Sequence, residues 1–152
     1  MATISRNKRA FADYEILDKL EAGMVLSGQE VKSAKSGGAS LGGSYAKILN
    51  GELFLVGAQI RPYQYASTGL EGYDPQRTRK LLVHAQELRR LRTALEEKGR
   101  TLVPLELYVK KGRIKVLLGV GSAKKKYDKR ASIRKREVER KIRHVLKQRS
   151  QG

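Results

Sequence analysis

The amino-acid sequence predicts a mainly β, α+β protein: a small antiparallel barrel with flanking helices, followed by a basic C-terminal tail. Two observations predict the barrel. Apolar and polar residues alternate over several short runs, as in strands with one covered face, and Asn50-Gly51 separates two such runs, which is the strongest short signal for a β-hairpin. A third observation predicts the tail. From Ser122 to Gly152, thirteen Lys or Arg stand against three Asp or Glu, so this segment carries +10 of the chain's net charge of +18.

The first apolar stretch runs from Phe11 to Leu20 and is interpreted as an ordinary edge strand. Farther along, Ser27 and Glu30 have the spacing of a capping box, in which a hydroxyl and a carboxylate each bond a backbone N–H of the first helical turn. This spacing predicts a short helix that ends near Ser36. We expect its Val31 and Ala34 to face inward. Four of its side chains are expected to point largely toward solvent: Gln29, Lys32, Ser33 and Lys35.

The middle of the chain predicts a hairpin, a long loop and a long helix. The second arm of the hairpin is expected to continue to Ile60. Residues 61–79 are irregular, and structureless segments of this length inside a compact domain are usually functional or mobile. Residues 81–98 are interpreted as the one long helix of the body, because Leu81, Leu88, Leu91 and Leu95 lie on one helical stripe.

Two strands with alternating apolar residues are expected near residues 105–109 and 114–120, as the last strands of the body. A turn at Lys110-Lys111-Gly112 is expected to join them. Strands then outnumber helices, and residues 1–121 are predicted to form one domain, with residues 122–152 as a separate tail. The oligonucleotide-binding barrel is one architecture of this size. Periodicity alone does not choose it over another α+β arrangement.

Within the tail, Val138, Ile142, Val145 and Leu146 share one narrow helical face. An isolated helix depends on packing for most of its stability, and the cations between Arg134 and Lys147 repel one another. We therefore expect the tail to be disordered in the free protein and helical against a phosphate surface. A helix docked on its own barrel is the alternative.

Composition favours a nucleic-acid partner and argues against several other classes. The sequence pI of about 10.4 is typical of nucleic-acid-binding proteins. The chain has no Trp, two Phe and no apolar run of membrane-spanning length, so we expect no membrane association. Its N-terminal residues lack the apolar core of a signal peptide. The absence of Cys removes disulfides, thiolate catalysis and cysteine zinc sites, and fits the cytoplasm.

Catalytic motifs are missing as well. The two histidines, His84 and His144, lie far apart in the sequence and have no metal-ligand spacing around them. There is no phosphate-binding loop, and no carboxylate pair stands out as an acid and base. Gly119 and Gly121 are explained by close backbone packing. We expect no enzyme activity, no catalytic residue, no cofactor and no metal.

Six strings of the sequence are specific when they are taken together. They are NKRAF at 7–11, EAGMVLSGQEVKSAKSG at 21–37, SY at 44–45, DPQRTRKLL at 74–82, KGRTLVPLELYVKKGRIKVLLGVG at 98–121 and KKKYDKR at 124–130. These strings resemble the small protein B family, the SsrA-binding proteins of bacteria. The resemblance runs from about Ile4 to Lys147 in one order and without a large gap. One departure is Ser122-Ala123, where a glycine-containing pair is often found, and it should alter hinge flexibility more than contacts.

The resemblance implies a non-enzymatic RNA-binding adaptor of trans-translation, the rescue of stalled ribosomes. Its fold would be an oligonucleotide-binding-like barrel that binds the tRNA-like domain of transfer-messenger RNA and replaces the missing anticodon arm. The tail would enter the empty mRNA channel and fold there as a helix. The expected partners are this RNA, the ribosome with its 16S and 23S rRNA, and an elongation factor–GTP complex that delivers the charged RNA. The protein is expected to be a monomer.

The resemblance also assigns residues to the two surfaces. Glu21 is unusual on an RNA-binding surface, because its charge repels phosphates. A carboxylate can still accept a hydrogen bond from an amino group of a splayed base. The alternative is that Glu21 is an ordinary turn residue. Two roles stay open for Asp128: a hydrogen bond to a base edge, or an ion pair within the chain with Lys129 or Arg130. The surface for transfer-messenger RNA comprises Asn7, Lys8, Arg9, Glu21, Gln29, Glu30, Lys32, Ser33, Lys35, Arg77, Arg79, Lys80 and Leu82. The ribosome-binding tail residues are Lys124, Lys125, Lys126, Tyr127, Asp128, Lys129, Arg130, Val145 and Leu146.

Two other classes of function stay open on the residues alone. A structural ribosomal protein would share the small barrel and basic tail, but it would purify with every ribosome, whereas an adaptor would be enriched on stalled ones. A nuclease of stalled messages would need a metal cluster or a general base, and the sequence offers neither.

Overall fold

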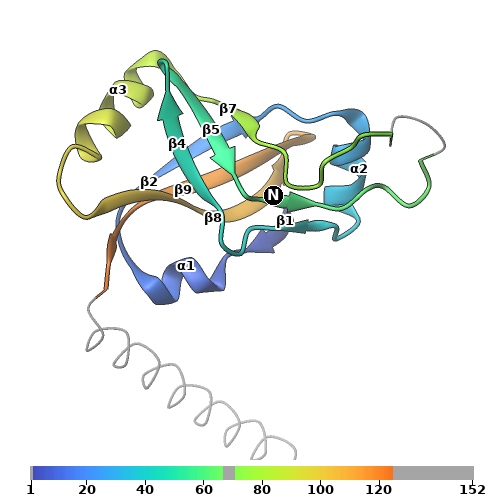
Figure 1. Cartoon of the computed structure of the whole chain (residues 1–152), viewed down its shortest axis with the longest axis horizontal. Coiled ribbons are helices and arrows are strands. Elements are labelled where there is room, and N and C mark those ends of the chain that lie inside the picture. The colour runs from blue at the N-terminus through green and yellow to red at the C-terminus, as the bar shows by residue number, and fades with distance from the viewer. Residues whose placement is uncertain (1, 67–70, 125–152) are drawn as a thin grey trace, which may run out of the picture.

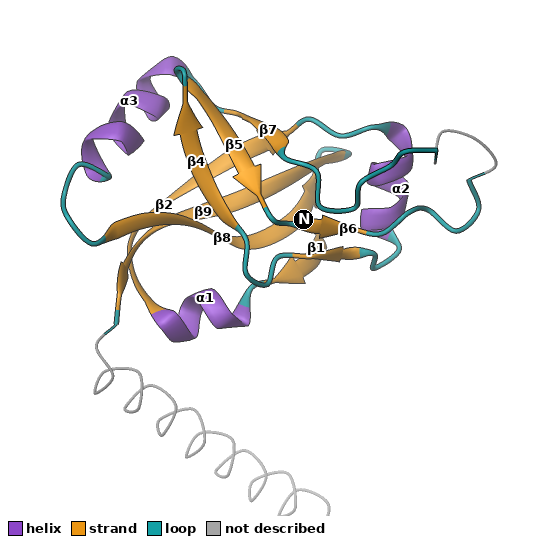
Figure 2. Ribbon diagram, in the orientation of Figure 1, coloured by secondary structure: helices purple, strands orange, loops and turns teal. Residues whose placement is uncertain are grey.

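The structure is a computed structural model that describes residues 2–66 and 71–124 of the chain. Within these ranges it contains nine strands and three helices, arranged as a barrel with the helices outside it (Figures 1 and 2). The strands are β1 (Ala2–Arg6), β2 (Tyr14–Met24), β3 (Ala39–Ser40), β4 (Tyr45–Leu49), β5 (Glu52–Val56), β6 (Gln59–Ile60), β7 (Arg79–Leu82), β8 (Arg100–Lys110) and β9 (Arg113–Ala123). The helices are α1 (Lys8–Asp13), α2 (Gly28–Lys35) and α3 (Ala85–Ala94).

The main sheet closes on itself. Its strand order is β1-β8-β4-β5-β7-β2-β9, and β8 also pairs with β9, so the six strands β8, β4, β5, β7, β2 and β9 form a ring. All of these pairings are antiparallel. Of the neighbouring strands in this ring, β4 and β8 share the fewest paired positions. Their one pair is Ala46 opposite Leu102. The expected antiparallel barrel with flanking helices is confirmed.

Both predicted turns are present and set the register of their hairpins; positive φ was predicted for the first and is found in both. Asn50 and Gly51 have φ of 52° and 75° between β4 and β5, and Lys111 and Gly112 have φ of 52° and 75° between β8 and β9. Right-handed strand twist favours this turn geometry, which glycine and asparagine adopt at low cost. The alternation of each strand then places its apolar side chains inside the barrel.

The barrel interior is filled by branched aliphatic side chains from every strand of the ring. Leu53 lies opposite Leu81 across β5 and β7, and both are almost completely buried. Close packing also explains two glycines. A Cβ on Gly119 would lie 2.9 Å from Leu105 Cδ1, and one on Gly121 would lie 3.0 Å from Tyr14 Cβ. The expectation that close packing accounts for these glycines is confirmed.

The N-terminal prediction was wrong in part. The stretch from Phe11 to Leu20 does not form one strand, because residues 8–13 form α1 and the strand β2 begins at Tyr14. Asn7 caps α1 by accepting a hydrogen bond from Ala10 N at 3.2 Å. β1, which pairs with β8, was not predicted either.

Three boundaries also differ in the middle of the chain. The second hairpin arm ends at Val56, since Gly57 has φ of 83° and β6 pairs with β3 in a separate two-stranded sheet. The helix predicted for residues 81–98 is shorter and begins at Ala85. Leu81 belongs to β7, where it pairs with Met24 and Leu53. The last strand, β9, continues to Ala123, two residues beyond the predicted end of the body.

Candidate nucleic-acid interface

Glu30 is the centre of a buried polar cluster that joins α2 to β7. The capping box of α2 is confirmed: Glu30 N donates to Ser27 Oγ at 3.2 Å, and Ser27 N donates to Glu30 Oε1 at 3.0 Å. The same carboxylate accepts from two arginines that follow the long loop. Arg77 donates to both of its oxygens, and Arg79 Nε donates to Oε2 at 3.0 Å. One carboxylate therefore holds the start of a helix and the end of a loop together.

Arg79 is completely buried, and every polar group of its guanidinium has an acceptor or a partner. Besides Glu30, it donates to the carbonyl oxygens of Ala58, Pro75 and Arg77 at 2.8 to 3.0 Å, and to the Tyr73 hydroxyl at 3.1 Å. Buried charges are tolerated when they are paired and fully hydrogen-bonded. Burial by itself would raise the pKa of Glu30, but the hydrogen bonds from Arg77, the Ser27 backbone and Arg79 outweigh it and lower that pKa to about 2.

A second carboxylate, Glu21, lies at the surface of the barrel on β2. It accepts a hydrogen bond from the Tyr108 hydroxyl and pairs with Lys110 Nζ at 3.3 Å, both from β8. The hydrogen bond from Tyr108, followed by the nearby lysines, lowers the pKa of Glu21, and the same contact together with burial raises the pKa of Tyr108. Glu21 is therefore an ionised acceptor held in one orientation among cations.

The strand register places four residues in one row beside Glu21. Tyr108 lies opposite Lys115, Lys115 opposite Gly23, and Gly23 opposite Leu82, across β8, β9, β2 and β7. Leu82 is 53% exposed at the end of this row. Next to it is a hollow of about 290 Å³ whose wall includes Val25, Leu82, Arg113 and Lys115. We call Glu21, Leu82, Lys110, Arg113 and Lys115 the outer β2 face.

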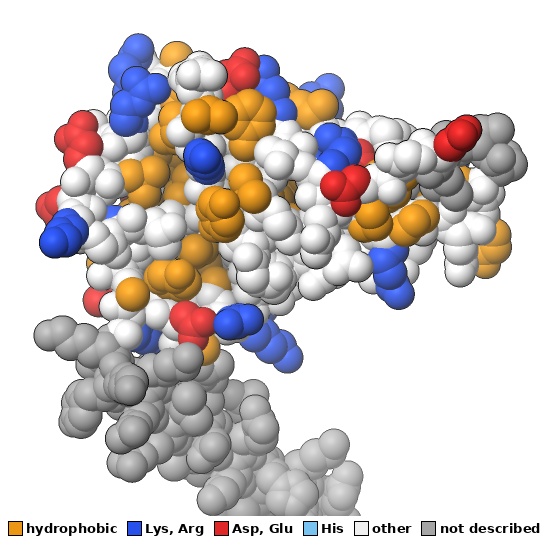
Figure 3. Space-filling view, in the orientation of Figure 1, with side chains coloured by type: hydrophobic (Ala, Val, Ile, Leu, Met, Phe, Trp, Pro, Cys, Tyr) orange, Lys and Arg blue, Asp and Glu red, His pale blue; other side chains and the backbone are white. Residues whose placement is uncertain are grey.

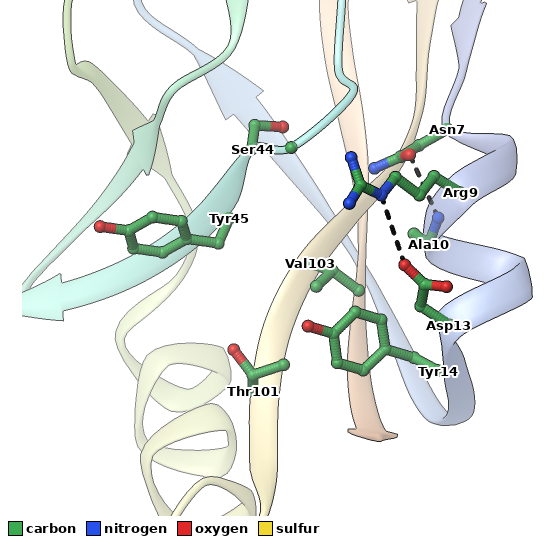
Figure 4. A pocket seen from close by; sticks show the side chains of 10 residues that line it. Asn7, Arg9, Ala10, Asp13, Tyr14, Ser44, Tyr45, Thr101 and Val103 are labelled. Carbon is green, nitrogen blue, oxygen red and sulfur yellow. Dashed lines mark hydrogen bonds and ion pairs between the residues drawn. The ribbon is translucent and has the colours of Figure 1, made fainter. Parts of the chain in front are cut away.

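A second hollow lies between α1 and the barrel (Figure 4). It measures about 310 Å³, and its wall includes Arg9, Tyr14, Tyr45 and Thr101. Arg9 pairs with Asp13 at 3.4 Å one helical turn away. Asn7 lies at the back of this hollow with its side chain buried. Its Nδ2 donates to the Pro104 carbonyl oxygen at 2.8 Å, which fastens α1 to β8.

The described surface combines hollows with exposed cations and apolar side chains. Among the described residues there is no group of three or more His, Cys, Asp or Glu that would hold a metal ion. In the same part of the chain, no helix has the length and apolar character needed to cross a bilayer. On the face shown in Figure 3, hydrophobic, basic and acidic side chains are interspersed, and the lysines and arginines do not form one continuous patch. Cations beside apolar side chains fit a folded RNA, whose bases and phosphates are both accessible.

Comparison with known proteins agrees with this interpretation. The model of the SmpB protein family matches residues 4–148. The chain belongs to the SmpB protein family. It is 48% identical to the SsrA-binding protein of Syntrophobacter fumaroxidans over 97% of this chain and 91% of the relative. It is 51% identical to the SsrA-binding protein of Nitrosospira multiformis over 91% of this chain and 93% of the relative.

A solved SmpB structure has the same fold. It is reported as "tmRNA-SmpB: a journey to the center of the bacterial ribosome", is 48% identical in sequence and superposes with a TM-score of 0.66. The superposition covers 80% of this chain and 84% of the solved chain. The resemblance noted in the sequence is thereby confirmed.

In this SmpB chain, the predicted RNA-binding residues separate into exposed and buried groups. Ser33 was expected to face solvent, and that was wrong, because it is buried and its hydroxyl donates to the Arg61 carbonyl oxygen. The expected inward position of Ala34 is confirmed, while Val31 is half-buried. Buried residues are Asn7, Glu30, Ser33 and Arg79; exposed or partly exposed ones are Lys8, Arg9, Glu21, Gln29, Lys32, Lys35, Arg77, Lys80 and Leu82.

These residues do not form one cluster. Glu30, Arg77 and Arg79 meet in the buried network, whereas Glu21 and Leu82 lie on neighbouring strands of the outer β2 face. Lys80 projects from the same face of β7 as Leu82, two residues away, and pairs with Glu52 of β5 at 3.1 Å. Asn7, Lys8 and Arg9 lie at the start of α1 beside the second hollow.

The tail of this SmpB chain is described only at its start. Lys124 N donates to the Asp13 carbonyl oxygen at 2.9 Å, and its Nζ donates to the Phe11 carbonyl oxygen at 3.2 Å. The predictions for Lys125, Lys126, Tyr127, Asp128, Lys129, Arg130, Val145 and Leu146 lie outside the described residues.

Sequence reasoning missed two tyrosines of this site. Tyr108 orients Glu21, and Tyr73 joins the Glu30–Arg79 cluster by accepting from Arg79 Nη2 at 3.1 Å, while its own hydroxyl donates to the Ile60 carbonyl oxygen at 2.8 Å. Tyr108 does carry a local signal, because it is the one aromatic residue of β8, and buried tyrosines need a partner for the hydroxyl. Tyr73 lies in the long irregular segment, where no periodicity marks it.

Proposed function

We propose that this chain is a non-enzymatic, tmRNA-binding adaptor of trans-translation that acts in the bacterial cytoplasm. The observation that carries the proposal is the match to the SmpB family over residues 4–148, together with its likeness to relatives named SsrA-binding proteins. The pairing of a rigid barrel with a strongly basic C-terminal segment supports the same role.

The outer β2 face is proposed to bind the tRNA-like domain of the RNA. Its cations neutralise phosphates, which provides affinity without sequence preference. Glu21 accepts from a base amino group, and its ionised state and fixed orientation suit that task. Leu82 and the neighbouring hollow offer apolar surface to a sugar or base.

The buried members of the predicted set are proposed to act as positioning residues. Glu30 and Arg79 hold α2 against the loop, so that Gln29, Lys32 and Lys35 present to the RNA from a fixed helix. Asn7 fastens α1, which carries Lys8 and Arg9. Loss of RNA binding on mutation of these buried residues would then follow from movement of their neighbours.

The tail from Lys124 onward is proposed to contact ribosomal RNA, with Tyr127, Asp128, Lys129 and Arg130 near the decoding centre and Val145 and Leu146 on the apolar side of a helix in the empty mRNA channel. It is proposed to be disordered until it binds there. An elongation factor–GTP complex is proposed to deliver the charged RNA with one copy of the protein.

The test separates RNA binding from ribosome rescue. A chain ending after Lys124 keeps β9 complete and retains the Lys124 contacts to α1. It should bind an in vitro transcript of the tRNA-like domain as tightly as the full chain and fail to support peptide tagging on stalled ribosomes. The full-length Val145→Glu, Leu146→Glu double variant should behave in the same way, with Gln148→Glu, Ser150→Glu as a control that changes the net charge equally. Absence of binding by the full chain would exclude the adaptor function.

A further inference from the structure

Tyr65 is the most exposed of the large apolar side chains in the described part of the chain. It is 75% exposed, while the other exposed large apolar side chains, such as Leu82, range from 44% to 53%. Its ring packs edge to face against Tyr63, with ring centroids 5.5 Å apart and an angle of 71° between the planes. The two aromatic rings form a small platform, in which Tyr65 is open to solvent and Tyr63 is partly buried.

Cations flank this platform. Lys32 Nζ lies 5.9 Å from the centre of the Tyr63 ring, close enough for a cation–π contact. Arg61 is exposed, and one N–H of its guanidinium donates to the Gly37 carbonyl oxygen at 3.1 Å. Lys35 is exposed one turn after Lys32 on α2. Aromatic faces beside cations are the arrangement by which proteins bind single-stranded nucleic acid, since bases stack and phosphates pair.

The platform stands on a fixed base. Arg61 N donates to the Gly38 carbonyl oxygen at 2.9 Å, and the Arg61 carbonyl oxygen accepts from Ser33 Oγ. The Tyr63 carbonyl oxygen accepts from Ala66 N at 3.0 Å, which closes a turn around Tyr65. These bonds tie the first residues of the loop to α2, so the exposure of Tyr65 comes from an anchored turn.

A hollow of about 420 Å³ adjoins the platform, which is within the size range of small-molecule sites. It supplies hydroxyl, amide and guanidinium groups, and its described lining has no carboxylate. The lining residues are Ser33, Ser36, Gly38, Arg61, Pro62, Tyr63 and Gln64. Figure 1 shows α2 and the segment after β6 at one end of the molecule, away from α1 and α3.

We propose that Tyr65 and Tyr63 form a stacking site for one unpaired base of the bound RNA, with the adjoining phosphate held by Lys32 and Arg61. This inference rests on the proposed function and adds a contact outside the outer β2 face. Stacking on an aromatic ring tolerates any base, so the site adds affinity without strict sequence choice.

The test compares three full-length variants in binding to a transcript of the tRNA-like domain over a range of salt concentrations. Tyr65→Ala should weaken binding roughly fivefold to a hundredfold, with the slope of log affinity against log salt unchanged, because every phosphate keeps its cationic partner. Tyr65→Phe should retain the wild-type affinity, since the ring remains. Lys32→Ala should reduce the slope by about one.

Each outcome decides the proposal. Unchanged affinity of Tyr65→Ala, or an equal loss in Tyr65→Phe, overturns the stacking site while wild-type binding leaves the adaptor function intact. Failure of the wild-type chain to bind would instead overturn the proposed function. Thermal unfolding at the wild-type temperature would show that the Tyr65 variants are folded, as expected for a side chain with so little buried surface.

Discussion

Arg79 and Glu30 form an ion pair that is almost completely removed from solvent. Arg79 Nη2 lies 2.8 Å from Glu30 Oε2, and the two side chains are 0% and 2% exposed. The pair joins β7 to the first turn of α2 and so holds the C-terminal end of the long loop against that helix. Both residues match RNA-binding positions by resemblance, yet both side chains are buried. The part in RNA binding proposed for them above is therefore to position α2 and the loop.

Removal of Arg79 should strongly destabilise the protein. Arg79→Met leaves the Glu30 charge buried with Arg77 as its remaining cation, and breaking one side of a buried pair costs about 3–5 kcal/mol. Urea denaturation followed by circular dichroism measures the free energy of unfolding. Lys80→Met is the matched control, because its pair with Glu52 is exposed and should contribute less than about 1 kcal/mol. Equal losses in the two variants would refute the structural role of Arg79.

The ionisation of Glu30 should make the free energy of unfolding depend on pH. Its pKa is about 2 in the folded protein and near 4.5 when unfolded, so its contribution is present above pH 4.5 and is lost as the pH falls toward 2. The full loss is about 3 kcal/mol. Unfolding free energies of wild type and Glu30→Gln should therefore differ most above pH 4.5 and converge below it. A difference that stays constant down to pH 2 would contradict this assignment.

Tyr108 should control the ionisation of Glu21. Tyr108→Phe removes the hydroxyl that donates to the carboxylate, so the pKa of Glu21 should rise toward its ordinary value. Carbon-detected NMR titration of the carboxyl group measures this change directly. The same variant should bind the tRNA-like domain more weakly, because Glu21 loses its fixed orientation. Unaltered titration of Glu21 would show that Lys110 alone holds it.

Gly119 should not tolerate a side chain. A Cβ there would lie 2.9 Å from Leu105 Cδ1 and 3.1 Å from Ile16 Cγ2, inside the packed strands β8, β9 and β2. Overpacking of this kind costs about 1–3 kcal/mol, so Gly119→Ala should lower the unfolding midpoint in urea. Gly28→Ala is the control, because no heavy atom lies within 4 Å of its added Cβ. A drop in stability from both variants would indicate an effect unrelated to packing.

Local features of the fold could be predicted from the sequence, and contacts between distant segments could not. The Asn50-Gly51 hairpin and the Ser27–Glu30 capping box depend on neighbouring residues, and both were predicted correctly. The Glu30–Arg79 pair joins residues 49 positions apart, and no spacing rule reaches that far. The resemblance to a family pointed to both Glu30 and Arg79 as RNA-binding positions, but it did not indicate that their side chains are buried.

The errors in secondary structure have similar physical causes. Leu81 lies seven residues before Leu88, a spacing that fits a helical stripe, yet pairing with Met24 and Leu53 draws it into β7. α1 has six residues, too few to show a periodic pattern, although Asn7 is a preferred N-cap residue and was a usable signal. Ser33 was placed on the solvent side because its partner, the Arg61 carbonyl oxygen, comes from a loop that the helix pattern does not include.

The cations of the outer β2 face are proposed to bind the phosphates of the tRNA-like domain. The salt dependence of affinity tests this for Arg113→Gln, Lys115→Gln, compared with Arg89→Gln, Arg92→Gln on α3, which changes the net charge equally. The first pair should lower the slope of log affinity against log salt by about one for each phosphate that no longer meets a cation, and the second should leave it unchanged. Equal slopes for both double variants, or a smaller slope in the α3 pair alone, would contradict the claim.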